Sequence, residues 1–267
     1  MKITEIYCKT ALSKSLLPGF DYALNPYRGC EHSCIYCYAS AVLREPRKWG
    51  SFIDVKIDIP TILAKELSKK KRGVVGIGTV TDAYQPIEKK YELTRKCLYE
   101  LLKHDFPISI QTKASLILRD LEIIKKFSEK DVGVTITTID EELRKKYETY
   151  SSTVEERFEA LEKFAHAGIE TWVFIGPVMP YITDRNNNLE KLIDKIALTG
   201  TKRIIVDRLR LKKGTWGNIK EFVLENYPEL LPKYKEIFFC VSDYFEKVHL
   251  EIEKLCKDYK IKCERAF

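Results

Sequence analysis

Three cysteines stand close together near the start of the chain, where Cys30, Cys34 and Cys37 form the spacing C-x3-C-x2-C. Three thiolates on one short loop can bind three irons of a cubane iron–sulfur cluster and leave the fourth iron open to another ligand. Two other interpretations remain: a zinc ion held by these thiols with His32, or plain core thiols. Structural zinc sites usually draw their ligands from two separated pairs, so the single group favours the cluster.

Polar side chains follow four short apolar runs farther along the chain. In parallel α/β folds, ligands bind at the carboxyl ends of strands, so four such groups predict a shared pocket there. Taken singly, each group would simply begin a loop. The groups are Thr79, Thr81 and Asp82; Gln111, Thr112 and Lys113; Thr137 and Thr138; and Asp207, Arg208 and Arg210.

The elements that must position these groups alternate along the chain. Short β-branched runs predict buried strands, and stretches with apolar residues at helical spacing predict helices between them. Repeated strand–helix units predict parallel strands with crossover helices, and six units are too few for a closed eight-stranded barrel. We therefore expect an α/β fold, a partial (β/α)6 TIM-like barrel. Strands are expected at 22–27, 74–77, 108–110, 132–136, 172–175 and 204–206, and helices at 87–104, 116–130, 154–168, 188–199 and 241–259.

The expected barrel spans residues 22–210, with 1–21 as an N-terminal extension and 211–267 as a C-terminal helical extension. The 267 residues are 45% hydrophobic and 32% charged, as in one large globular domain. No apolar run approaches the roughly 18 residues of a membrane helix, and the first residues lack the apolar core of a secretory signal. We therefore expect a cytoplasmic protein without a membrane partner.

Charge and cysteine content give further indications of the protein's chemistry and partners. Eight cysteines in a reducing compartment indicate metal or redox chemistry and not a disulfide framework. The net charge of +7 permits an anionic partner such as nucleic acid. Five cysteines lie outside the loop. We expect Cys97, Cys240 and Cys256 to be core residues, while a second cluster on Cys240, Cys256 and Cys263 is the alternative.

The aromatic residue inside the motif, Tyr36, makes it C-x3-C-x-aromatic-C, and with it the chain resembles the radical S-adenosylmethionine (SAM) enzymes. Residues 25–39, 78–86, 112–113 and 118–120 resemble the branch related to spore photoproduct lyase, and the resemblance covers most of 22–207. It implies a partial barrel with a [4Fe–4S] cluster at its mouth and SAM bound to the fourth iron. An electron from an external donor would then release a 5′-deoxyadenosyl radical that abstracts hydrogen from a substrate.

The resemblance also implies roles for single residues. Cys30, Cys34 and Cys37 would be the cluster ligands. Tyr36 would lie against the adenine side of SAM. Tyr36 and Tyr38 would also be catalytic residues that lie near the substrate and take part in hydrogen transfer, with aromatic packing around the cluster as the alternative role of Tyr38.

Further residues would hold SAM. Thr81 and Asp82 match the positions that bind its amino group, although Asp82 could instead cap a helix. Lys113 matches the position that pairs with its carboxylate, although a lone lysine normally faces solvent. Thr135 and Thr137 lie two apart on the fourth strand, and we expect one of them to meet the ribose or the carboxylate; both could instead be ordinary strand residues.

The sequence gives the fewest indications about the residues near the adenine and the substrate. Val178 is expected to flank the adenine. Arg208 and Arg210 follow the last expected strand and open a basic stretch that reaches Trp216. Basic residues beside an aromatic one can bind phosphate and stack a base, so we expect both arginines at the substrate; a solvated loop is the alternative.

One departure from the branch separates this chain from its repair reaction. Spore photoproduct lyase has a hydrogen-donating cysteine just before the position that matches Thr81, and residues 78–82 contain none. Three functions therefore remain. The first is a radical SAM enzyme acting on a nucleic acid base or nucleotide, favoured by the charge and the basic loop. The others are a radical SAM enzyme acting on a peptide or small molecule, and a non-enzymatic zinc-holding nucleic acid binder.

Overall fold

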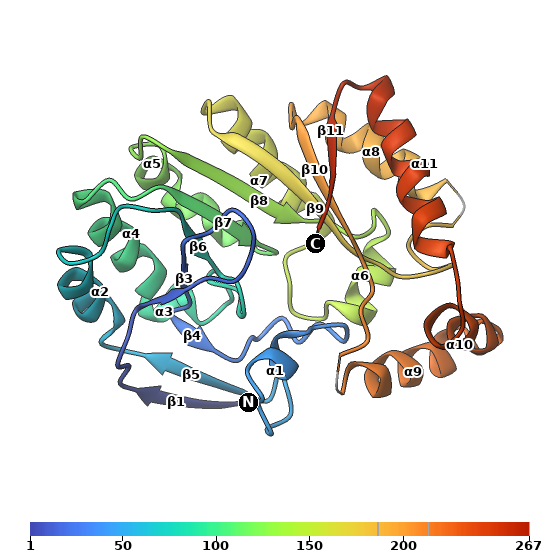
Figure 1. Ribbon diagram of the computed structural model, residues 1–267, viewed down its shortest axis with the longest axis horizontal. Helices are drawn as coiled ribbons and strands as arrows, with labels where there is room; N and C mark the ends of the chain where they lie inside the picture. Colours follow the sequence, from blue (N-terminus) through green and yellow to red (C-terminus); the bar gives the residue numbers. More distant parts are fainter. Residues whose placement is uncertain (186, 213, 267) are drawn as a thin grey trace.

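A large, mostly parallel sheet forms the centre of the molecule (Figure 1). The computed structural model describes residues 1–185, 187–212 and 214–266, so Lys213 of the basic stretch lies outside the described residues. The strand order is β11-β10-β9-β8-β7-β6-β3-β2, in which β2 is antiparallel to β3 and every other pair is parallel. The strands are β2 (Leu12–Lys14), β3 (Tyr22–Leu24), β6 (Val75–Ile77), β7 (Ile108–Thr112), β8 (Lys130–Thr135), β9 (Glu170–Val178), β10 (Arg203–Arg208) and β11 (Lys262–Arg265).

The expected α/β fold with a large parallel sheet is confirmed. All six expected strands are present, as β3 and β6 to β10. Their β-branched residues are buried because helices pack along the outer side of the sheet (Figure 1). Two of these helices also match the expectation closely, α7 (Val154–His166) and α8 (Asn188–Leu198). Gly168 follows α7 with φ +75°, a conformation that ends a helix.

The helix expected at 87–104 is two helices, α3 (Glu88–Tyr91) and α4 (Leu93–Lys103). The break falls at Glu92, whose φ is +52°. The buried Glu88 carboxylate accepts hydrogen bonds from the first free N–H groups of α4, those of Thr94 (3.0 Å) and Arg95 (3.3 Å). Because this carboxylate belongs to α3 and caps the first N–H groups of α4, a new helix begins where apolar spacing alone predicted one continuous helix.

The helix expected at 116–130 is also wrong in its extent. The segment forms a 3-10 helix, η1 (Ser115–Asp120), and a short helix, α5 (Leu121–Ile124). Asp120 is fully buried and pairs with Arg95 at 2.6 Å and with Arg119 at 3.1 Å. These ion pairs hold the segment against α4, in a conformation that periodicity could not indicate.

The N-terminal part of the chain contributes strands to the main sheet and to a second, smaller sheet. A second, three-stranded sheet has the order β1-β5-β4, from β1 (Lys2–Ile6), β4 (Tyr27–Arg28) and β5 (Phe52–Lys56). It lies at the lower left of Figure 1 with the N-terminus. Two helices accompany these strands, α1 (Ala39–Val42) and α2 (Ile59–Leu67). The cysteine loop begins directly after β4 and ends at α1.

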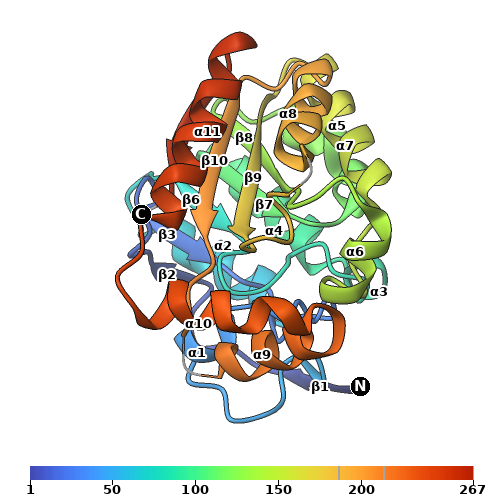
Figure 2. The same ribbon diagram turned by 90° about the vertical axis from the view of Figure 1, so that its right-hand side faces the viewer.

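The C-terminal residues are mostly helical, as expected. They form α9 (Thr215–Asn226), η2 (Pro228–Leu230), α10 (Leu231–Phe239) and α11 (Tyr244–Asp258); the remaining helix, α6 (Glu141–Tyr147), precedes α7. Helices α9 and α10 lie across one end of the sheet, and α11 runs alongside the strands (Figure 2). The extension also returns to the main sheet as β11, which was not expected. Among the described residues, no helix has both the length and the apolar character needed to cross a bilayer.

Burial of the other cysteines follows expectation with one exception. Cys97 and Cys256 are fully buried on helix faces. Cys240 is exposed, so its assignment to the core was wrong. It lies just after α10, where the chain turns toward α11, and the apolar run before it ends at the surface.

Candidate active site

The three clustered cysteines lie on the loop between β4 and α1. All three are free thiols; Cys30 is buried, and Cys34 and Cys37 are partly buried. Two turns fold the loop, one in which the Ser33 N–H donates to Cys30 O (3.3 Å) and one in which the Cys37 N–H donates to Cys34 O (3.1 Å). The turns bring the thiols near enough for their charges to affect one another.

The chemistry of this donor set fits a cationic group. Burial raises the pKa of all three thiols, to about 12 for Cys34, and neighbouring thiols raise the pKa of Cys30 and Cys34 further. Three buried thiolates are therefore unfavourable without positive charge among them, which a bound iron–sulfur cluster would supply.

The spacing of side chains bears on which metal group fits. Within the described residues, no three His, Cys, Asp or Glu side chains are close enough to hold a single metal ion. A tetrahedral zinc holds thiolate sulfurs about 3.8 Å apart. A cubane binds each thiolate through a different iron and holds the sulfurs farther apart, so it does not require the three thiols to converge on one ion.

Thr81 holds the start of the cysteine loop. Its hydroxyl donates to the carbonyl of Gly29 at 2.6 Å and accepts from Gln85 Nε2 at 3.0 Å. The same Gln85 side chain accepts the N–H of Glu31 at 2.8 Å. The segment after β6 thus binds the backbone on both sides of Cys30.

Asp82 is buried at the centre of a second set of contacts. Its Oδ1 accepts from the Tyr84 N–H (2.9 Å) and the Thr112 hydroxyl (2.7 Å). Its Oδ2 accepts from the Lys113 N–H (2.8 Å) and lies 3.3 Å from His32 Nδ1, outside hydrogen-bond geometry. Burial alone would raise the pKa of Asp82, but the charge of His32 and these hydrogen bonds lower it well below its usual value. The carboxylate therefore joins the ends of β6 and β7 to the cysteine loop.

Lys113 lies directly after β7 with its ammonium among negative groups. Burial would lower the pKa of Lys113, but the charges of Cys34, Glu148 and Asp82 raise it overall. Its Nζ lies 5.8 Å from the centre of the Tyr36 ring. In the part of the chain that the structure describes, no carboxylate comes within ion-pair distance of this ammonium, so it can accept an anionic ligand.

Tyr36 and the two threonines lie beside a buried ion pair that the sequence did not indicate. Tyr36 is buried and donates its hydroxyl to Glu148, which pairs with Arg157. Thr137 lies two residues beyond the end of β8, and its hydroxyl contacts the Tyr147 hydroxyl at 2.7 Å. The Thr135 hydroxyl, at the end of β8, instead accepts from Gln111 Nε2 at 3.2 Å. The two threonines therefore have different surroundings.

Tyr38 is the most exposed of the aromatic site residues, at 45%. Its hydroxyl donates to the Thr79 carbonyl at 2.8 Å. Desolvation of the hydroxyl, followed by the negative charges of Cys37 and Asp207, raises the pKa of Tyr38 to about 12, with Lys113 opposing.

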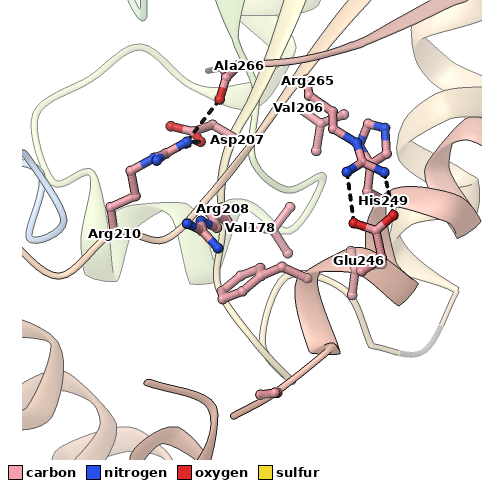
Figure 3. A pocket seen from close by; sticks show the side chains of 12 residues that line it. Val178, Val206, Asp207, Arg208, Arg210, Glu246, His249, Arg265 and Ala266 are labelled. Atoms are coloured by element: carbon pink, nitrogen blue, oxygen red, sulfur yellow. Dashed lines mark hydrogen bonds and ion pairs between the residues drawn. The ribbon is translucent and has the colours of Figure 1, made fainter. Parts of the chain in front are cut away.

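A cavity of about 360 Å³ opens at the ends of β9, β10 and β11, against α11 (Figure 3). Val178, Arg208 and Arg210 all line it, and Val178 is opposite Arg208 in the β9–β10 pair. Arg265 is paired with Glu246 at 2.6 Å. Figure 3 shows Arg208 beside Val178, both among the residues that line the cavity.

The two arginines differ in their partners. Arg210 pairs with Asp207 at 3.1 Å and donates to the Ala266 carbonyl at 3.0 Å. Arg208 is exposed, and within the described residues its guanidinium forms no ion pair or hydrogen bond. Arg208 is therefore the cation of this cavity that remains open to an anionic ligand.

Comparison with known proteins agrees with the resemblance seen in the sequence. The family model described as the radical SAM superfamily matches residues 24–196. An uncharacterized protein of Methanocaldococcus jannaschii is 34% identical over 231 residues, which cover 86% of this chain and 85% of that protein. An uncharacterized protein of Mycobacterium tuberculosis is 30% identical over 275 residues, with 96% and 81% covered.

Solved structures show the same fold. Spore photoproduct lyase complexed with dinucleoside spore photoproduct aligns with a TM-score of 0.73 at 16% identity, covering 99% of this chain and 82% of that one. Streptococcus suis SuiB bound to S-adenosylmethionine aligns with a TM-score of 0.57 at 13% identity, covering 91% and 49%.

Proposed function

Because this chain belongs to the radical SAM superfamily, we propose that it is a radical SAM enzyme whose cluster is held by Cys30, Cys34 and Cys37 at the mouth of a partial (β/α)6 barrel. The observation that carries the proposal is that three free thiols lie close to the ammonium of Lys113. The thiols share one loop, and Lys113, without a carboxylate partner in the described residues, lies at the adjoining strand end. Thiolates and an open cation are what a cluster and the carboxylate of SAM require.

The cluster and SAM, when bound, supply the 5′-deoxyadenosyl radical that abstracts hydrogen, with the electron coming from an external donor. The chain's own residues position and shield this chemistry. Lys113 binds the SAM carboxylate, and Thr81 and Asp82 bind its amino group while they also hold the cysteine loop. Carboxylate and hydroxyl oxygens each have more than one acceptor site, so the contacts already present leave room for the ammonium.

The adenosine side of SAM has its own set of residues in this proposal. Tyr36 packs against the adenine, and Val178 flanks it from the end of β9. Thr135 or Thr137 meets the ribose or the carboxylate. Their burial excludes water from the site, which protects a reactive radical from side reactions.

We place the substrate in the cavity beside α11. Arg208 offers an open positive charge there, Arg210 lines the same cavity, and exposed Tyr38 directly follows the last cysteine of the loop. A cationic cavity favours an anionic substrate, and a nucleic acid base or nucleotide is the class that the net charge of +7 also favours. Spore photoproduct lyase binds a dinucleoside spore photoproduct. Because residues 78–82 contain no cysteine, we do not extend that enzyme's repair reaction to this chain.

Reconstitution tests the cofactor proposal. Anaerobically reconstituted protein is expected to be brown, to hold about four irons per chain, and to cleave SAM under reduction. Replacement of Cys30, Cys34 or Cys37 by Ala should abolish both iron binding and cleavage, whereas Cys240→Ala, at an exposed thiol outside the loop, should leave both intact. A colourless protein with one zinc, or a loop variant that still cleaves SAM, would refute the proposal.

A deuterium-transfer screen tests the substrate. Deuterated DNA, RNA and peptide pools would each be incubated with the reconstituted enzyme, and 5′-deoxyadenosine would be analysed for label. Label from a nucleic acid pool supports the proposed class. Label from peptides alone would refute that class and indicate the peptide alternative.

A further inference from the structure

Glu148 is a fully buried acid in the connection between α6 and α7, directly beside the cysteine loop. Its Oε1 accepts a hydrogen bond from the Tyr36 hydroxyl, 112 residues earlier in the chain. One residue before it, the Tyr147 carbonyl accepts the N–H of Ile35 at 3.1 Å. A side chain and a backbone group of one connection therefore hold two successive residues of the loop, both of them between Cys34 and Cys37.

Arg157 of α7 fixes this carboxylate in place. Its Nη2 lies 2.5 Å from Glu148 Oε2, and both side chains are fully buried. The guanidinium also donates to Ser152 O (3.0 Å), to Thr135 O (2.9 Å) and to the Ser151 hydroxyl. Burial raises the pKa of Glu148, but the charge of Arg157 opposes this and the pKa is lowered overall, so the acid is ionised. Glu148 is thus a fixed, charged acceptor.

The same connection reaches the end of β7. The Ser152 N–H donates to the Lys113 carbonyl at 3.2 Å, and the Ser152 hydroxyl accepts from the Ser115 N–H at 2.9 Å. The charge of Glu148 also raises the pKa of Lys113. The α6–α7 connection therefore contacts both halves of the candidate site, the cysteine loop and the strand end that carries the open ammonium.

We propose that Glu148 is a positioning residue that fixes the Tyr36 ring and the Cys34–Cys37 segment relative to Lys113. The part of this inference that concerns SAM rests on the function proposed above. A buried ion pair adds little net stability, because desolvation offsets its attraction. Apolar residues of the same volume could not accept the hydrogen bond from the Tyr36 hydroxyl, so this bond explains why an ion pair is present here.

Hydrogen exchange on iron-free protein tests the inference without the cofactors. Tyr36→Phe removes the hydroxyl and leaves the Glu148–Arg157 pair intact. Because a hydrogen bond to a charged group is lost, amides in 33–38 should exchange about tenfold faster. Tyr244→Phe is the matched control: it removes another tyrosine hydroxyl that donates to a carboxylate, that of Asp184 at 2.6 Å, at the start of α11, and should leave exchange in 33–38 unchanged.

Binding of SAM to reconstituted protein gives the second readout. Tyr36→Phe and Glu148→Asp should each weaken SAM binding about tenfold, and the double variant should weaken it by less than the product of the two single effects, because both changes break the Tyr36–Glu148 contact. Glu148→Asp keeps the charge beside Arg157, so it avoids the unpaired arginine that Glu148→Gln would leave to unfold the chain.

The outcomes separate the two proposals. Equal exchange in 33–38 for Tyr36→Phe and Tyr244→Phe would overturn the positioning role, even if the protein cleaves SAM. Additive effects of Tyr36→Phe and Glu148→Asp on SAM binding would overturn it as well. If the exchange result holds but the protein never binds iron or SAM, the proposed function fails and the hold of Glu148 on the cysteine loop stands.

Discussion

Gly29→Ala should disturb the cysteine loop from the residue just before Cys30. Gly29 has φ +91°, a conformation that a side chain rarely adopts. A Cβ built there would lie 2.3 Å from the Phe52 carbonyl oxygen and 3.1 Å from the Phe52 ring. The carbonyl belongs to the backbone of β5, so it cannot move away without displacing the small sheet.

The magnitude follows from two separate contributions. Placing Ala at positive φ costs about 1 kcal/mol, and an added methyl group in a filled space costs about 1–3 kcal/mol more. The sum of roughly 2–4 kcal/mol corresponds to a melting temperature about 4–16 °C lower in a chain of this size. Gly19→Ala is the matched control, because Gly19 has φ +81° and no atom lies within 4 Å of its Cβ position. It should lower the melting temperature by only about 2–4 °C.

Two assays measure the effect. Thermal unfolding of the iron-free proteins gives the stability difference, and iron content after reconstitution reports whether Cys30 has been displaced. We expect Gly29→Ala to bind less iron and Gly19→Ala to bind the wild-type amount. If Gly29→Ala were as stable as Gly19→Ala and bound as much iron, the argument that β5 and the cysteine loop form one rigid unit would be refuted.

Three further predictions concern other parts of the chain. Contact with Arg47 lowers the pKa of the Glu45 carboxyl to about 2. Glu45→Gln should therefore lower the free energy of unfolding by about 1 kcal/mol or less above pH 4.5. Thermal unfolding measured against pH should show this difference vanish as the pH falls toward 2. Native alkylation should modify exposed Cys240 before buried Cys97, as mass spectrometry would show; equal rates would contradict the burial described. Arg208→Ala should raise KM for an anionic substrate about tenfold and leave substrate-free SAM cleavage unchanged; an unchanged KM would exclude the cavity as the substrate site.

Local sequence patterns predicted the parallel core well. Buried strands are short and β-branched, and helices such as α7 and α8 carry a regular apolar face, so both can be recognised from neighbouring residues alone. The interrupted helix at 87–104 could not. Its break depends on the buried Glu88 carboxylate, which also contacts Tyr27 and Arg119 from distant parts of the chain.

The sequence by itself determined the kind of chemistry, because the three cysteines and Tyr36 lie within eight residues. Their spacing along the chain is the same however the remaining residues fold. Only the tertiary structure decided what surrounds them. Glu148 looks like an ordinary surface acid at a helix end, and nothing near it in sequence indicates that it meets Tyr36 across 112 residues. Such a contact arises when parallel strands bring their carboxyl ends to one edge of a sheet, and packing there joins residues that no local pattern can relate.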